Sequence, residues 1–142
     1  MTDDFQRAAR RQGWLFEQFV ETGLLMEGWK LVAKNWREPL TGCEIDRVML
    51  DPGGVEWWIE CKGSWEGREA AKGARRGDTV KKAIGVAWML SRLNQRDRRP
   101  YMLVVSHKPT ARVPRKMLDA ALEDGLFTAV RQVGLGDSIG AL

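Results

Sequence analysis

Apolar residues recur along the chain at two different spacings, which predict three helices and five strands. A spacing near 3.6 residues predicts helices at residues 4–24, 80–94 and 113–123. Alternating or short continuous apolar runs predict strands at residues 29–35, 44–50, 55–62, 101–106 and 126–133. The order is α-β-β-β-α-β-α-β, so we expect an α/β domain in which helices cover both faces of a hairpin-rich sheet.

The connections between these elements have recognisable compositions. Asp51-Pro52-Gly53-Gly54 is a strong turn sequence between two apolar runs, and it predicts a β-hairpin formed by the second and third strands. Residues 63–77 are glycine-rich and basic, which predicts a loop or a loop with a short helical turn. We expect a single domain over residues 1–142, with its core in 1–133 and a loose tail at 134–142.

Acidic residues interrupt the apolar runs of both hairpin strands. Glu44 and Asp46 are two residues apart on the first, and Glu60 and Lys62 are two residues apart on the other. Side chains two apart on a strand share a face, so three carboxylates and one amine are expected to converge. Carboxylates among apolar neighbours are costly unless they are paired or bind a metal. The group suits a divalent metal ion and a phosphodiester substrate.

The composition argues against several other classes of protein. The chain has 142 residues, of which 44% are hydrophobic and 30% charged, as in soluble globular domains. No apolar run reaches the ~20 residues of a membrane span, and the N-terminus lacks the apolar stretch of a signal peptide. We therefore expect a cytoplasmic protein with no membrane partner. Two cysteines and one histidine give little support to metal or redox chemistry at Cys43, Cys61 and His107.

The charge of the chain favours a polyanionic partner. The net charge is +4 and the isoelectric point is about 9.3. Seven basic and three acidic residues lie between Lys62 and Lys82, so the basic excess follows the second acidic group. A solvated loop and helix face would explain this excess equally well. The candidates for nucleic-acid contact are Trp65, Lys72, Arg75, Arg76, Lys81 and Lys82.

Seven tryptophans are a high number for a chain of this length. Trp57 and Trp58 are adjacent on a predicted strand, so they face opposite ways. Trp58 shares the face of Glu60 and Lys62, where it would be placed to stack on a flipped or single-stranded base. A core position is the commoner role for such a tryptophan, and it is the one that we expect.

The pattern of Asp46, then Glu60-Cys61-Lys62 after a hairpin, with Glu17 on the preceding helix, resembles the PD-(D/E)xK nuclease superfamily. The segment Gly42-Cys43-Glu44-Ile45-Asp46 is similar to the GxEID segment of small stand-alone members, which include bacterial Holliday-junction-resolvase-like proteins. The resemblance spans roughly Glu17 to Trp88. It implies a restriction-endonuclease-like fold with an αβββαβ core and a mixed central sheet, Mg²⁺-dependent cleavage and a nucleic-acid substrate.

The resemblance also implies a role for each site residue. Asp46 and Glu60 would be metal ligands, Lys62 the catalytic lysine and Glu17 the helix-borne acid that completes the site. Glu21 lies one turn after Glu17 and competes with it for that role. Glu44 would either assist a second metal or lie at the rim of the site. Ile45 stands where the superfamily motif has a proline.

These observations predict a Mg²⁺-dependent nuclease, with Mn²⁺ able to substitute and DNA as the favoured substrate of an endonucleolytic cut. The alternative is a non-catalytic nucleic-acid-binding or assembly module that retains the same fold. A homodimer is a further expectation, because cleavage of a duplex requires two cuts.

Overall fold

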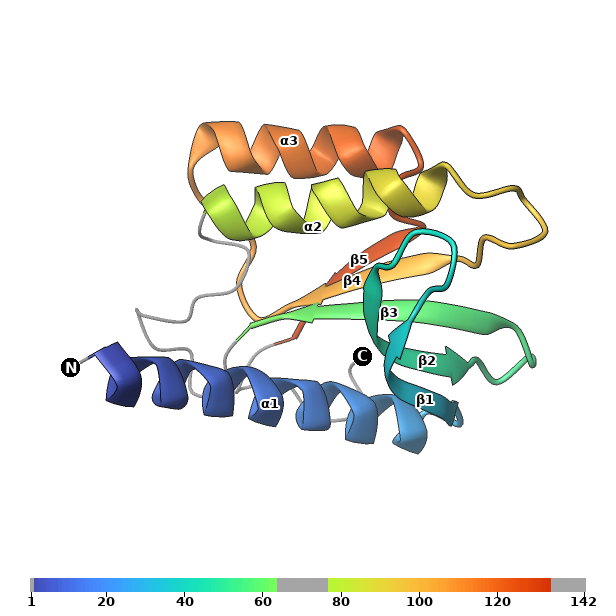
Figure 1. Ribbon diagram of the computed structural model, residues 1–142, viewed down its shortest axis with the longest axis horizontal. Coiled ribbons are helices and arrows are strands. Elements are labelled where there is room, and N and C mark those ends of the chain that lie inside the picture. The colour runs from blue at the N-terminus through green and yellow to red at the C-terminus, as the bar shows by residue number, and fades with distance from the viewer. Residues whose placement is uncertain (1, 64–76, 134–142) are drawn as a thin grey trace.

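The computed structural model describes residues 2–63 and 77–133, which form a five-stranded mixed sheet with helices on both faces (Figure 1). The helices are α1 (Thr2–Met26), α2 (Gly77–Ser91) and α3 (Arg112–Glu123). The strands are β1 (Lys30–Arg37), β2 (Glu44–Leu50), β3 (Glu56–Lys62), β4 (Tyr101–Val105) and β5 (Ala129–Gln132). The predicted order of elements and the α/β class are therefore confirmed. No described helix has the length and apolar character that a membrane crossing requires.

The predicted and observed boundaries differ most at two elements. α2 ends at Ser91, three residues before the predicted end, because Arg92 and Leu93 bond to carbonyls three residues back in a tight last turn. β5 is shorter than predicted because Leu126 and Thr128 form the connection from α3. The N–H of Leu126 bonds to Ala121 and that of Thr128 to Tyr101.

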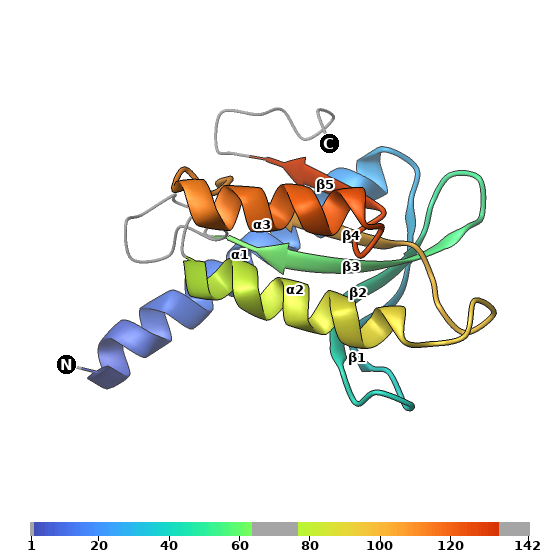
Figure 2. The same ribbon diagram turned by 90° about the horizontal axis from the view of Figure 1, so that it is seen from above.

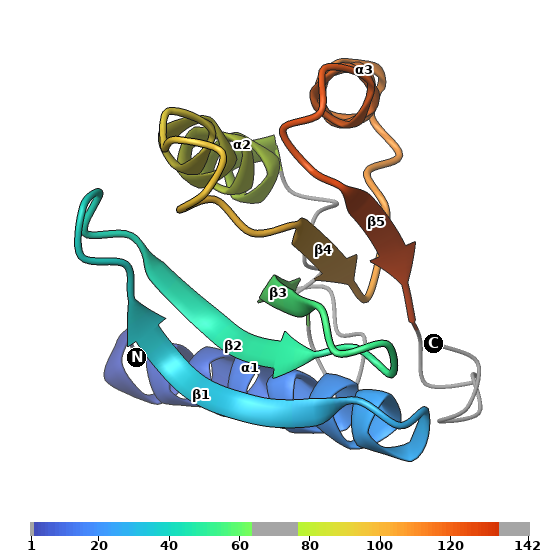
Figure 3. The same cartoon turned by 90° about the vertical axis from the view of Figure 1, so that its right-hand side faces the viewer.

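The strands lie in the sheet in their order along the chain. β1, β2 and β3 pair in antiparallel fashion, whereas β3, β4 and β5 pair in parallel. Parallel neighbours require a crossover, and α2 and α3 belong to the two crossovers. α2 and α3 lie side by side on one face of the sheet, and α1 lies on the other (Figures 2 and 3).

Each face of the sheet has its own hydrophobic core. α1 contributes Phe16, Val20 and Leu24 to the core on its side, where they pack with alternate residues of the central strands, such as Ile59 and Val104. The core on the opposite side contains residues of α2 and α3 packed with the other alternate set. Its members include Val48, Trp58, Tyr101, Leu103 and Leu118. Burial on both faces explains why β4 is apolar throughout.

The turn of the hairpin between β2 and β3 is fixed by Asp51. Its carboxylate accepts hydrogen bonds from the backbone N–H of Val55 at 2.9 Å and from the indole N–H of Trp57 at 3.1 Å. Gly54 has a φ of 88°, a conformation that favours glycine. The predicted hairpin is thereby confirmed.

The two hairpin strands separate before they reach their far ends. Their backbone pairing runs from Leu50 opposite Glu56 to Arg47 opposite Ile59. At the next position a side chain replaces the backbone as the acceptor. Asp46 Oδ2 accepts a hydrogen bond from the N–H of Cys61 at 2.8 Å. We call the region where β2 and β3 separate, at Asp46 and Glu60-Cys61-Lys62, the fork.

Candidate active site at the fork

Asp46 and Glu17 bring two carboxyl groups together from different elements. Asp46 lies on β2 at the fork, and the carboxyl of Glu17 on α1 lies within hydrogen-bonding reach of it. Burial and then the negative charge of Asp46 raise the pKa of Glu17 to about 7, although the charge of Arg47 opposes this. Glu17 is therefore partly protonated near neutral pH.

Glu60 and Lys62 form an ion pair on β3, at the other side of the fork. Lys62 Nζ lies 3.1 Å from Glu60 Oε1, and the Glu60 side chain is only 7% exposed. The second oxygen of Glu60 accepts a hydrogen bond from the hydroxyl of Tyr101 at 3.3 Å. Because burial raises the pKa of Tyr101 above its ordinary value, this phenol remains a donor.

The surroundings of the fork raise the pKa values of both partners in this ion pair. Burial and then the charge of Asp46 raise the pKa of Glu60 to about 8, against the opposing effect of Lys62. Burial lowers the pKa of Lys62, but the carboxylates of Glu60 and Asp46 outweigh it, so the pKa of Lys62 lies above its ordinary value. Lys62 therefore carries a positive charge at neutral pH. Asp46 lies at the centre of this group, since its charge acts on Glu17, Glu60 and Lys62 alike.

Arg47 is a buried charge that joins α1 to the fork. Its side chain is 2% exposed and its Nε lies 2.7 Å from Glu21 Oε1. One terminal nitrogen donates to the backbone carbonyl of Asp46 at 2.8 Å and lies 3.9 Å from Glu17 Oε1. Glu21 is thus occupied by Arg47, and Glu17 is the acid of α1 that lies against Asp46.

The donor set of the fork fits a divalent cation. Carboxylate oxygens are the ligands that Mg²⁺ prefers, and it often takes only one or two of them together with water. A cation would also relieve the repulsion that raises the pKa values of Glu17 and Glu60. Within residues 2–63 and 77–133, however, no three His, Cys, Asp or Glu side chains are already arranged as metal ligands. Lys62 and Tyr101 occupy the oxygens of Glu60.

The structure brings some of the predicted site residues together and leaves others apart. Glu17, Asp46, Glu60 and Lys62 meet at the fork. Glu44 instead lies 3.5 Å from Arg37, with half of its side chain exposed, and no contact described in the structure joins it to the fork. The expectation that Glu44 converges with Asp46 is therefore wrong for this arrangement.

The cause of that error is a local break in the alternation of β2. Ile45 and Val48 belong to the same core although they are three residues apart, so the strand does not keep a period of two at Asp46. Beyond the fork β2 still pairs with β1, where Glu44 lies opposite Arg37. The Glu44 carboxylate pairs with the Arg37 side chain there and not with residues of the fork.

The predicted nucleic-acid contacts can be placed only in part. Lys81 and Lys82 lie in the first turns of α2 and are exposed, as a phosphate contact requires, so their role remains a prediction. The other four candidates lie outside the described residues. They are Trp65, Lys72, Arg75 and Arg76.

Trp58 lies in the core as expected from the sequence, and the two cysteines pack on opposite faces of the sheet. Trp58 is 2% exposed and belongs to the core, where its ring packs at 5.9 Å from that of Trp36. Cys61 is buried in the core under α1, and burial raises the pKa of its thiol well above the ordinary range. Cys43 packs against the opposite core, so the two thiols do not form one site.

Arg47 and Tyr101 were not predicted as parts of the site. Arg47 had a detectable signal, since a charged residue inside the apolar run Ile45–Leu50 needs a buried partner. Tyr101 had none, because it follows Glu60 by 41 residues and reaches it only through the parallel pairing of β3 and β4.

Comparisons with known proteins identify no relative of this chain. No protein family matches the chain, and no curated protein or solved structure matches it significantly.

Proposed function

We propose that this protein is a divalent-metal-dependent nuclease that hydrolyses phosphodiester bonds, with DNA as the favoured substrate of an endonucleolytic cut. The observation that supports it best is the meeting of Glu17, Asp46, Glu60 and Lys62 at one fork of the sheet. The resemblance in sequence to PD-(D/E)xK nucleases involves these same four residues. We extend the proposal to the fold and assign the αβββαβ core to the restriction-endonuclease-like type.

The roles of the residues follow from their surroundings. Asp46 and Glu60 would hold the metal ion, with Glu17 beside Asp46 as a further acid. A bound Mg²⁺ supplies positive charge to the reacting phosphate and a bound water of lowered pKa. Lys62 remains protonated, so its ammonium can orient the attacking water and stabilise the negative charge that develops on the phosphate. Tyr101 orients the carboxylate of Glu60 through its hydrogen bond.

A cleavage assay on a panel of substrates tests the proposal. The panel contains duplex and single-stranded DNA, four-way junctions, flaps and RNA, each with Mg²⁺ or Mn²⁺. We expect the wild type to cut at least one of them and Asp46→Asn to lose activity by about 100-fold or more. A matched control is Glu44→Gln, which changes a carboxylate on the same strand that is paired with Arg37. Full activity of Asp46→Asn on every substrate cut by the wild type would refute the assignment.

A non-catalytic binding module is the second candidate. It is favoured by the occupied oxygens of Glu60, which are already satisfied by Lys62 and Tyr101 without a metal. Calorimetric titration with Mn²⁺ separates the two functions. The nuclease predicts a site that is lost in Asp46→Asn, whereas the module predicts no heat of binding that depends on Asp46.

A further inference from the structure

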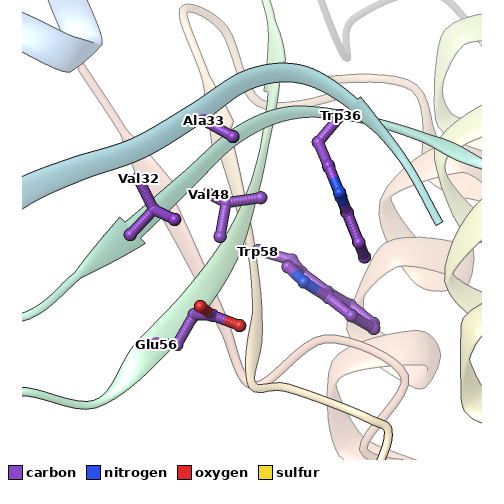
Figure 4. Close-up of a pocket in the computed structure, with 6 residues that line it drawn as sticks. All are labelled: Val32, Ala33, Trp36, Val48, Glu56 and Trp58. Atoms are coloured by element: carbon purple, nitrogen blue, oxygen red, sulfur yellow. The ribbon is translucent and has the colours of Figure 1, made fainter.

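A small pocket opens on the sheet next to the fork, on the face covered by α2 and α3. Its volume is about 150 Å³. Figure 4 shows its lining, which consists of apolar and aromatic side chains from three neighbouring strands and one carboxylate. The lining residues are Val32, Ala33 and Trp36 of β1, Val48 of β2, and Glu56 and Trp58 of β3.

The pocket and the fork adjoin along both hairpin strands. Val48 follows Asp46 by two residues and Trp58 precedes Glu60 by two, a separation of about 7 Å along a strand. Val48 and Trp58 belong to the same core as Tyr101, whose hydroxyl contacts Glu60. A ligand in the pocket would therefore lie on the same face as Glu60, a short distance from it.

The size of the pocket suits one six-membered ring. A buried cavity of about 150 Å³ is large enough to bind benzene in a well-studied protein core. Trp36 and Trp58 pack against one another with an interplanar angle of 34°, so a ligand ring has to lie beside this pair and not between its members. Figure 4 shows Val48 between Val32 and the two indoles. The volume accommodates a single ring.

The polar side of the pocket selects a hydrogen-bond donor. Glu56 is the one charged residue of the lining, and its Oε2 is bound by Arg99 Nε at 3.2 Å. A carboxylate accepts hydrogen bonds and cannot donate them, so the ligand must bring a hydrogen-bond donor. Cytosine presents an exocyclic amino group that Glu commonly accepts. The one ring N–H of an unpaired thymine lies between two carbonyl oxygens, which a carboxylate repels.

The rim of the pocket beyond Glu56 is basic. Arg99 also donates to the carbonyl of Arg96 at 2.7 Å, and the Arg96 side chain is exposed. Both belong to the connection between α2 and β4, where residues 92–99 include four arginines and one aspartate. Positive charge on this side complements the phosphates of a strand that runs from the fork past the pocket.

We propose that this pocket binds one unpaired cytosine base of a DNA strand whose backbone crosses the fork. A flat apolar and aromatic enclosure suits the ring of the base, and Glu56 accepts from its amino group. The inference rests on the proposed nuclease function. Its test measures binding without metal, so the pocket and the nuclease can fail separately.

The test compares single-stranded oligothymidines that differ at one central base, by fluorescence anisotropy at pH 8 with a chelator present. We expect one cytosine to tighten binding about tenfold over the all-thymine strand. A central N4,N4-dimethylcytosine should abolish this preference, because it has no amino N–H to donate. This comparison uses only the wild-type protein and does not depend on the folding of a variant.

Two variants locate the effect in the pocket. Ala33→Leu fills the space and should remove the cytosine preference, whereas the matched Ala120→Leu, at an exposed position of α3, should retain it. Glu56→Met removes the acceptor and should bring the affinities for cytosine and thymine strands together. Equal affinities in the wild type, or a preference that survives Ala33→Leu, would overturn the proposal. A preference that behaves as expected in a protein that cuts no substrate would support the pocket and reject the nuclease.

Discussion

Replacement of Arg47 by methionine should destabilise the fold strongly, because it leaves a nearly buried carboxylate without its main partner. Arg47 is 2% exposed at its side chain and binds Glu21, which is 11% exposed, at 2.7 Å. Removal of one member of a buried ion pair costs about 3–5 kcal/mol. Lys34 lies 3.5 Å from the same Glu21 oxygen and relieves part of this penalty. We therefore expect Arg47→Met to lower the free energy of unfolding by about 3 kcal/mol.

This loss is large compared with the roughly 5–15 kcal/mol of total stability that is typical of a domain. Urea denaturation followed by tryptophan fluorescence and circular dichroism measures it, with linear extrapolation to water. Lys34→Met is the matched control, since Lys34 is 44% exposed and pairs with the same carboxylate. An exposed pair contributes about 0–1 kcal/mol, so the control should change little.

The double variant Arg47→Met with Glu21→Leu provides a further check. Apolar replacement of both members of a buried pair is often neutral or stabilising, so the second substitution should restore most of the lost stability. A cost below about 1 kcal/mol for Arg47→Met, or an equal cost for Lys34→Met, would contradict a buried ion pair between Arg47 and Glu21 as the source of this stability.

Three further predictions concern Gly63, Gly85 and Glu60. A Cβ on Gly63 would lie 2.6 Å from Ser106 Oγ and 2.9 Å from Phe16, so Gly63→Ala should lower the free energy of unfolding in urea by about 1–3 kcal/mol. An unchanged urea midpoint would contradict this. Gly85 in α2 has open space around its Cβ position, so Gly85→Ala should stabilise by about 0.5–1 kcal/mol in the same assay, and a loss would count against the helix packing described. The raised pKa of Glu60 means that the folded protein retains its proton at a pH where the unfolded chain has lost it. Its contribution to stability is complete below about pH 4.5 and is lost as pH rises toward about 8. In metal-free thermal melts from pH 5 to 9, the melting temperature of Glu60→Gln should therefore fall less steeply with rising pH than that of the wild type. Parallel falls in the two proteins would rule this out.

The sequence predicts those parts of the site that depend on local periodicity. Glu60 and Lys62 share a face because β3 keeps its alternation, and Asp51 closes the hairpin that brings Asp46 beside them. The helical spacing predicts α1, but Glu17 as its site acid is implied only by the resemblance. These relations involve neighbouring elements, whose register is set by the turn between them.

The rest of the site depends on relations that no local pattern contains. Where β2 separates from β3, the Asp46 side chain accepts a hydrogen bond from the N–H of Cys61. This contact depends on the backbone paths of both strands. Glu44 lies outside the site because its carboxylate pairs with Arg37 of the neighbouring strand β1. Tyr101 reaches Glu60 through a parallel crossover, so its role depends on the assembled sheet.

The decisive measurement for the proposed nuclease is the rate of phosphodiester cleavage by Lys62→Met, with Mg²⁺ and the substrate that the wild type cuts best. Methionine keeps the length of the side chain and removes the ammonium that lies 3.1 Å from Glu60. We expect a rate at least about 100-fold below that of the wild type, with the substrate still bound in a gel-mobility assay and Glu44→Gln close to wild-type activity. A Lys62→Met variant that cuts at the wild-type rate would contradict a catalytic site at the fork.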